Sequence, residues 1–275
     1  MLTVSGGMAS IGRFGAHLAL VLCSGCAGRA VSISAVPARP QRAAALEEVL
    51  AAHDGYCKGI DTLSASGDLE VRDFRAGKAR RLSVRLVATR GGKLYLKASV
   101  AVVTALELSS DGKQFWFQVP SRKTVWTGRA DQNPEAEDEQ APYYALRPAD
   151  VTAALLPEPL APGPHEAVVL EGDSDAFRLT VAPRARGVVR RAVSVDRESL
   201  RPLRSRQYDE RGDLASEFEY GEVTRGPARR VAVRRPREGY EALFTFDKAD
   251  ANVPVPARAF APRTPEGYKV VEVGR

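Results

Sequence analysis

The sequence is short of the residues on which most catalytic and metal sites depend. It has three histidines and three cysteines among 275 residues. Beyond residue 26 it contains no Gly-x-Ser-x-Gly, no His-Glu-x-x-His, no phosphate-binding glycine loop and no cysteine pair at zinc spacing. His53 and His165 are the only histidine bases that a nucleophile could use outside the first 25 residues. These absences favour a binding protein over an enzyme, and they predict neither a cofactor nor a metal.

The first residues follow the order of a secretory signal. Arg13 precedes an apolar stretch of roughly seven residues, 16–22, which is far shorter than the ~20 needed to span a bilayer. Cys23-Ser-Gly-Cys26 follows, with small residues directly before the second cysteine. The segment resembles a bacterial lipobox, although Cys23 stands where Leu or Val is commoner. Cys26 is therefore the predicted lipidation site, and an ordinary secretory signal is the alternative.

This assignment divides the chain into three parts. We predict a lipoprotein signal peptide over residues 1–25, a flexible tether over 26–40 and a single β domain over 41–275. Translation can start at Met1 or at Met8, and the sequence does not decide between them. A hydrophobic fraction of 44% is enough for a large core. The net charge of +6 comes from 40 basic and 34 acidic residues, so we expect a mixed surface, no nucleic acid partner and weak attraction to anionic lipids.

Two helices are expected in the domain. Apolar residues recur at helical spacing from Gln41 to Ile60, which predicts an amphipathic helix. His53 and Cys57 lie on its apolar face, where we expect a buried core histidine and an inert thiol. Residues 146–156 predict a short second helix that ends at Pro157.

The other apolar residues alternate with polar ones, which is typical of half-buried strands in an antiparallel sheet. One set of strands is predicted between about 62 and 127, and a second set between about 167 and 273. Residues 129–142, which are acidic and aperiodic, predict a surface loop between the sets. Ten apolar residues of the first set are expected to share one face of the sheet: Leu63, Leu69, Val71, Leu82, Val84, Leu86, Leu94, Leu96, Leu106 and Leu108.

Three stretches together resemble the LolA/LolB-like family of lipoprotein-handling domains. They are residues 106–128 with Phe115-Trp-Phe117, residues 146–156, and residues 208–212 taken with the closing run Phe260-Ala-Pro-Arg-Thr-Pro-Glu-Gly-Tyr268. The resemblance implies a mainly β fold, a curved, incompletely closed antiparallel β-barrel with helices plugging its mouth. It also implies a cavity that takes acyl chains. The ten residues named above are the candidate lining of that cavity, and a filled core is the alternative for each of them.

The sequence thus predicts a membrane-anchored lipoprotein that binds acyl chains and acts in lipoprotein or lipid transfer at the periplasmic side of the bacterial outer membrane. Ala27 after the acylated Cys26 favours that membrane under the sorting habits of such lipoproteins. A lipoprotein, a glycolipid and a phospholipid all stay open as cargo. The resemblance to the receptor LolB implies an exposed hydrophobic residue on a loop, but the sequence does not identify that loop. The alternative is an envelope scaffold or regulatory module that binds a protein partner through a sheet edge or the acidic loop.

Overall fold

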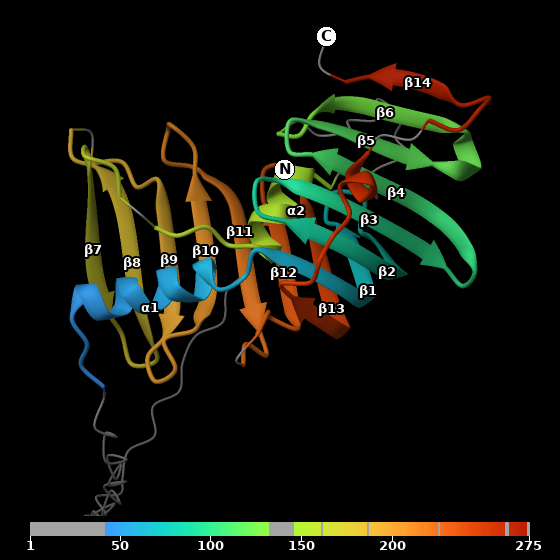
Figure 1. Ribbon diagram of the computed structural model, residues 1–275. Helices are drawn as coiled ribbons and strands as arrows, with labels where there is room; N and C mark the ends of the chain where they lie inside the picture. The colour runs from blue at the N-terminus through green and yellow to red at the C-terminus, as the bar shows by residue number, and fades with distance from the viewer. Residues whose placement is uncertain are drawn as a thin grey trace, which may run out of the picture. The chain divides into compact units, whose positions relative to one another are not determined.

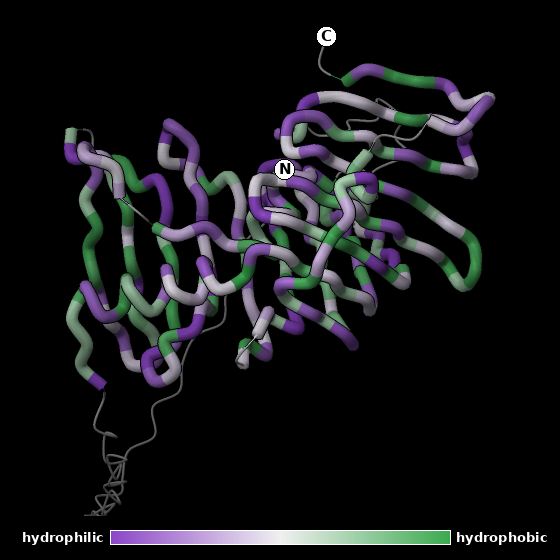
Figure 2. Tube along the Cα trace, in the orientation of Figure 1, coloured by the Kyte–Doolittle hydropathy of each residue, from purple (hydrophilic) through white to green (hydrophobic). Residues whose placement is uncertain are grey.

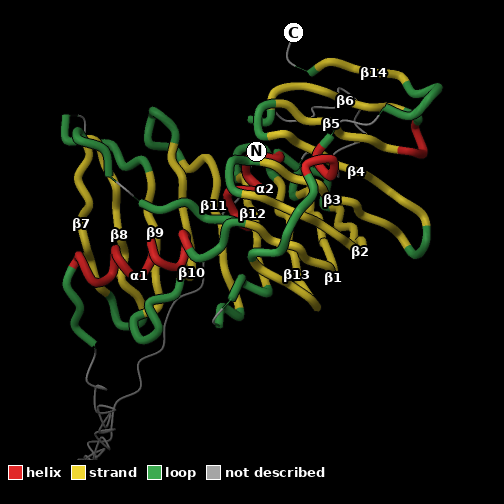
Figure 3. The backbone as a smooth tube through the Cα atoms, in the orientation of Figure 1, coloured by secondary structure: helices red, strands yellow, loops and turns green. Residues whose placement is uncertain are grey.

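In the part of the chain that the structure describes, fourteen strands form one continuous sheet, and two α-helices pack against one of its faces (Figures 1 and 3). The computed structural model describes residues 42–131, 146–160, 162–185, 187–224, 226–261 and 264–273, all within the unit Pro40–Arg275. The helices are α1 (Leu46–Lys58) and α2 (Pro148–Leu155).

In the described ranges, six strands precede α2 in the chain: β1 (Thr62–Asp73), β2 (Lys78–Thr89), β3 (Lys93–Val100), β4 (Val103–Asp111), β5 (Gln114–Val119) and β6 (Thr124–Arg129). The others follow it: β7 (Glu166–Gly172), β8 (Ala176–Pro183), β9 (Arg191–Asp196), β10 (Pro202–Tyr208), β11 (Leu214–Gly221), β12 (Arg230–Arg235), β13 (Tyr240–Ala251) and β14 (Lys269–Glu272). The described residues also include the short 3-10 helices η1 (Pro120–Arg122) and η3 (Ala257–Phe260).

The strand order is β14-β6-β5-β4-β3-β2-β1-β13-β12-β11-β10-β9-β8-β7. Neighbouring strands are antiparallel, with the exception of β14, which lies parallel to β6. Because β1 pairs with both β2 and β13, it joins the two sets of strands predicted from the sequence. β14 and β7 are the end strands, so the curved sheet is not closed, which confirms the expected incompletely closed architecture.

Most strands have a buried row of side chains on one face and a more exposed row on the other. In β2, Leu82, Val84 and Leu86 are buried while Ser83 and Arg85 are exposed, and Figure 2 shows the same alternation along other strands. We call the face that carries the buried rows and the two helices the inner face, and the opposite one the outer face. The alternation predicted from the sequence therefore arises because the helices cover only one side of the sheet.

One glycine is required by the close approach of two strands. A Cβ atom at Gly67 of β1 would lie 2.1 Å from the carbonyl oxygen of Thr245 in β13. The register between these strands shifts at Ser66 and Gly67, where a β-bulge interrupts the ladder. β13 continues past this point to Ala251.

The two helices cover different parts of the inner face. α1 crosses β7–β10 (Figure 1), and α2 contacts β12 and strands β2–β4. α1 begins at Leu46 rather than at Gln41, and α2 falls within the predicted range 146–156. No helix in the described ranges is long and apolar enough to cross a membrane.

Candidate functional site

The ten candidate cavity residues lie together on the inner face. Each side chain is at most 4% exposed, and all ten belong to one apolar cluster spread over β1–β4. Phe115 and Phe117 of β5 and Phe244 of β13 extend this cluster across the sheet. The sequence therefore placed these residues on the correct face of the sheet, and their role in binding a ligand stays a prediction.

α2 covers this cluster. Val151, Ala154 and Leu155 of the helix are at most 4% exposed and belong to the same cluster as the ten strand residues. Pro148 begins the helix and Pro157 follows it closely, which limits its length because proline cannot continue a helix. A helix of 8 residues is thus the main regular element over this part of the face.

A second apolar cluster lies under α1. Val49 of the helix packs with Phe177, Leu179 and Val193 of β8 and β9, and Leu160 from the segment after α2 joins them. These side chains are at most 4% exposed. The inner face therefore carries two apolar clusters, each beneath a different helix.

A polar band lies between the two clusters, on the inner side of β10 and β11. The Ser216 hydroxyl is 3.2 Å from Oε1 of Gln207, and Ser205 is only 2% exposed. The Tyr220 hydroxyl is buried and has no hydrogen-bond partner among the described residues, and burial raises the pKa of Tyr220 far above its usual range. A buried donor without a partner costs free energy. This hydroxyl is therefore available to donate a hydrogen bond to an acceptor group of a bound ligand.

His53 and Cys57 of α1 are both buried, as the sequence predicted. Nε2 of His53 lies 3.6 Å from the Cys57 sulfur, and Nδ1 lies 3.1 Å from Asp54. Burial lowers the pKa of His53, although the Asp54 carboxylate acts in the opposite direction. Burial also raises the pKa of Cys57 to about 12. The thiol therefore stays protonated near neutral pH and is a poor nucleophile.

A buried ion pair fixes α2 to the sheet. Nη1 of Arg235 in β12 donates to Oδ2 of Asp150 in α2 over 2.9 Å, and both residues are at most 8% exposed. Arg235 also contacts Glu238 at 2.6 Å, and Glu238 contacts Arg147 at 3.0 Å. These four residues hold the first turn of α2 beside the hairpin between β12 and β13.

Arg90 holds the other helix at its C-terminal end. Its guanidinium donates to the carbonyl oxygens of Cys57 and of Ile60, the latter at 2.6 Å, and to that of Pro157 at 3.4 Å. Asn252 adds a second fastening, because its side chain donates to the Gly59 carbonyl at 2.8 Å. One arginine therefore ties the end of α1 to the segment that leaves α2.

The sequence did not identify the most exposed apolar part of the structure. The hairpin between β3 and β4 exposes Val100 by 53%, Val102 by 97% and Val103 by 67%, and Ala101 takes a left-handed φ of 51° at the turn. We call these four residues the apolar tip. Four consecutive apolar residues at a turn were the available signal, because turns are usually polar.

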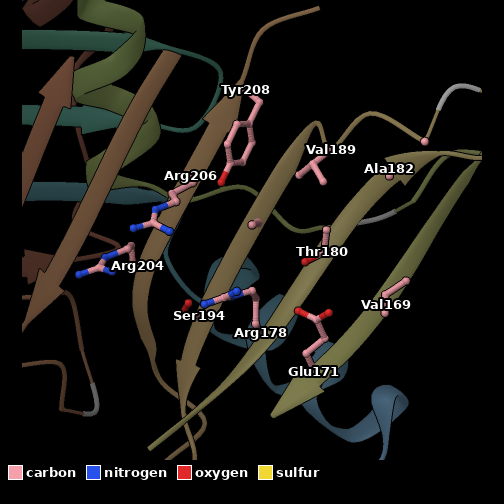
Figure 4. Close-up of a pocket in the computed structure, with 12 residues that line it drawn as sticks. Val169, Glu171, Arg178, Thr180, Ala182, Val189, Ser194, Arg204, Arg206 and Tyr208 are labelled. Carbon is pink, nitrogen blue, oxygen red and sulfur yellow. The ribbon is translucent and has the colours of Figure 1, made fainter. Parts of the chain in front are cut away.

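A pocket of about 420 Å³ lies on the outer face over β7–β10 (Figure 4). Arg178 reaches from β8 towards Ser194, while Arg204 and Arg206 turn towards β11. Arg206 contacts Glu217 at 2.6 Å, and this contact holds the pKa of Glu217 below its usual range although partial burial acts against it. The pocket therefore has a lining of mixed polarity.

Two predicted features lie outside the described residues. They are Cys26 with the signal and tether, and most of the acidic loop of residues 129–142, of which only the first three positions are described.

The sequence matches no family model and no curated protein. Among solved structures, a LolA superfamily protein from Nitrosomonas europaea is similar with a TM-score of 0.51 at 12% identity, over 80% of this chain and 99% of that one. An outer membrane lipoprotein-sorting domain from Vibrio parahaemolyticus has a TM-score of 0.47 at 13% identity, over 78% and 93% of the two chains. A DUF1329 family protein from Desulfovibrio piger has a TM-score of 0.48 at 16% identity, over 78% and 95%. The open sheet with its two helices is a LolA-like fold.

Proposed function

We propose that the protein is a membrane-anchored carrier that holds acyl chains between the inner face of its sheet and the two helices. The observation that carries this proposal is the pair of apolar clusters on an open sheet, each beneath a short helix. The LolA-like fold supports it, since the resemblance to that family implies an acyl cavity in the same place.

Area burial alone supplies enough free energy for such binding. An acyl chain that removes about 300 Å² of apolar surface from water gains about 7 kcal/mol at ~25 cal/mol per Å². Polar chemistry is then needed only to orient one end of the chain. The partnerless Tyr220 hydroxyl is suited to this, because an acyl carbonyl would accept its hydrogen bond.

α2 is the element that must move for a chain to enter. In the structure it covers the ten candidate residues, which are at most 4% exposed. It is held to the sheet by the buried ion pair of Asp150 with Arg235, by the contact of Arg147 with Glu238 and by a short apolar face. The acyl chain replaces the contacts of that apolar face when it binds.

The apolar tip is the proposed point of contact with the membrane. A hairpin that exposes three valines to water gains free energy when it enters the boundary between headgroups and acyl chains. Together with the proposed acylation at Cys26, the tip supports the proposal that the carrier acts at the periplasmic side of the outer membrane. Hand-over of the cargo then occurs where the tip meets the bilayer.

The test is titration of the purified protein with a fluorescent fatty acyl probe. We expect saturable binding of one probe per protein. Tyr220→Phe should weaken the binding of a carbonyl-bearing probe about fivefold, which corresponds to one hydrogen bond of about 1 kcal/mol. Tyr208→Phe is the matched control, because Tyr208 lines the outer-face pocket. If the probe shows no saturable binding to the wild-type protein, the proposal is wrong.

A second candidate function is recognition of a protein partner by strand addition at β7. This strand is an end of the sheet, and Val169 at its centre is 52% exposed. Val169→Lys should then abolish recovery of a partner from envelope extracts. Val270→Lys in β14, the other end strand, is the control because Val270 is 51% exposed. If both variants recover the same proteins as the wild type, strand addition at β7 is wrong.

A further inference from the structure

Two cations face each other directly on the outer face near the apolar tip. Arg85 of β2 and Lys97 of β3 are paired in the antiparallel ladder, and both point away from the buried rows. Like charges placed directly opposite each other destabilise a sheet. Lys97 has a carboxylate partner in Glu107 at 3.1 Å, whereas Arg85 has no ion pair among the described residues.

Hydroxyl groups surround this pair. Ser66 is the register partner of Arg85 on β1, and Ser83 pairs with Ser99 in the next outward row. The five side chains line one pocket of about 440 Å³, and Ala101 of the apolar tip lines it as well. The pocket thus offers Arg85, which has no ion pair among the described residues, Lys97, which shares its charge with Glu107, and three hydroxyl donors. These groups match an anion with several oxygen acceptors, of which phosphate is the common biological example.

Two carboxylates also line this pocket, Asp68 and Asp247. Asp68 forms an ion pair with Arg81, which leaves it little negative charge to offer Arg85. Asp247 is exposed and belongs to β13, which β1 separates from the strands that carry the two cations. The positive side of the pocket is therefore the side formed by β2 and β3, which leads to the tip.

The distance from the tip to the cations fits the structure of a bilayer. Lys97 precedes Val100 by three residues, which is about 10 Å along a strand. Groups that enter the interface lie about 5–10 Å into the boundary between headgroups and acyl chains. With the apolar tip at that depth, Arg85 and Lys97 stand at the level of the lipid phosphates.

We propose that this pocket binds the phosphate of an anionic phospholipid when the apolar tip is in the membrane. The occupant is a lipid headgroup because the pocket is continuous with the tip through Ala101. The proposal rests on the proposed function for its membrane contact. It goes further by naming the class of lipid bound, an anionic phospholipid, and the side chains that recognise its phosphate.

The experiment is cosedimentation of the full chain carrying Cys26→Ser in every arm, so that no acyl anchor contributes. Vesicles contain phosphatidylcholine alone or with about one third phosphatidylglycerol. Arg85→Gln and Lys97→Gln should each weaken binding to the anionic vesicles about fivefold, which is the contribution of one basic residue at an anionic surface. Arg178→Gln, which removes an exposed arginine from the outer face of β8, is the matched control and should change binding less than twofold.

Equal losses in Arg85→Gln and Arg178→Gln would show attraction by overall charge and overturn the proposal. Unchanged binding in both Arg85→Gln and Lys97→Gln would overturn it as well. If glycerol 3-phosphate at millimolar concentration displaces the protein as completely as removal of the anionic lipid, the pocket takes a soluble phosphate and the lipid assignment is wrong. The acyl probe titration separates this proposal from the proposed function, because Arg85→Gln should bind the probe as the wild type does.

Discussion

Asp150 and Arg235 form the buried ion pair that joins α2 to β12, with 2.9 Å between Oδ2 and Nη1. Breaking a buried ion pair typically costs about 3–5 kcal/mol, and Arg235 keeps Glu238 as its second partner, so we expect the low end of this range. Asp150→Asn should therefore lower the free energy of unfolding by about 3 kcal/mol, measured by urea denaturation. Asp150→Asn combined with Arg235→Met should lose less than the sum of the two single variants. A purely additive result would show that the pair does not couple the helix to the sheet.

His53 makes the stability of the protein depend on pH. Burial lowers the pKa of His53 below its ordinary value of 6.5, so the unfolded chain binds the proton more tightly than the folded protein. This contribution to stability is complete above pH 6.5 and is lost as the pH falls from there towards the folded pKa. Between about pH 7.5 and about pH 5.5, wild type should lose more unfolding free energy than His53→Gln. His165→Gln, at an exposed site, should follow the wild type; parallel curves for wild type and His53→Gln would contradict the account.

The apolar tip should act in transfer and not in cargo binding. Val102→Asp places a charge at a side chain that is 97% exposed, so folding is unaffected. We expect the variant to bind an acyl probe like the wild type and to deliver it to vesicles at least tenfold more slowly, measured by energy transfer to a labelled lipid. Phe74→Asp, at another exposed apolar residue, is the control. Equal delivery rates for Val102→Asp and the wild type would show that the apolar tip has no role in transfer.

The anchor is tested by Cys26→Ser. This change removes the predicted acyl acceptor while it leaves the charge and apolar core of the signal intact. Since two or more acyl chains hold a protein stably to a membrane, the variant should lose its lipid label and leave the membrane fraction. Cys23→Ser should change little. The assignment is wrong if Cys23→Ser loses the label and Cys26→Ser keeps it, and the lipoprotein prediction fails if neither loses it.

Periodicity predicted the inner face of the sheet well. The alternation of Leu82, Val84 and Leu86 with exposed partners is a local property of a half-buried strand, so the sequence contains it directly. The helical spacing around His53 identified the covered face of α1 in the same way. Both patterns arise from which side of an element meets water.

Features that depend on contacts between residues far apart in the chain could not be predicted from the sequence. The pairing of Asp150 with Arg235 joins positions 85 residues apart, and the Arg90 fastening joins strand, helix and loop. The exposure of Val102 was also not predicted from the sequence, because an apolar residue is ordinarily expected to be buried.

The central claim is that acyl chains bind on the inner face, beneath α2. Photo-cross-linking with a diazirine-bearing palmitic acid, followed by peptide mass spectrometry, tests it most directly. The account predicts saturable labelling concentrated in β2–β4, at residues such as Leu86, Leu96 and Leu106, with competition by unlabelled palmitate. Labelling confined to outer-face residues, or no saturable labelling, would contradict it.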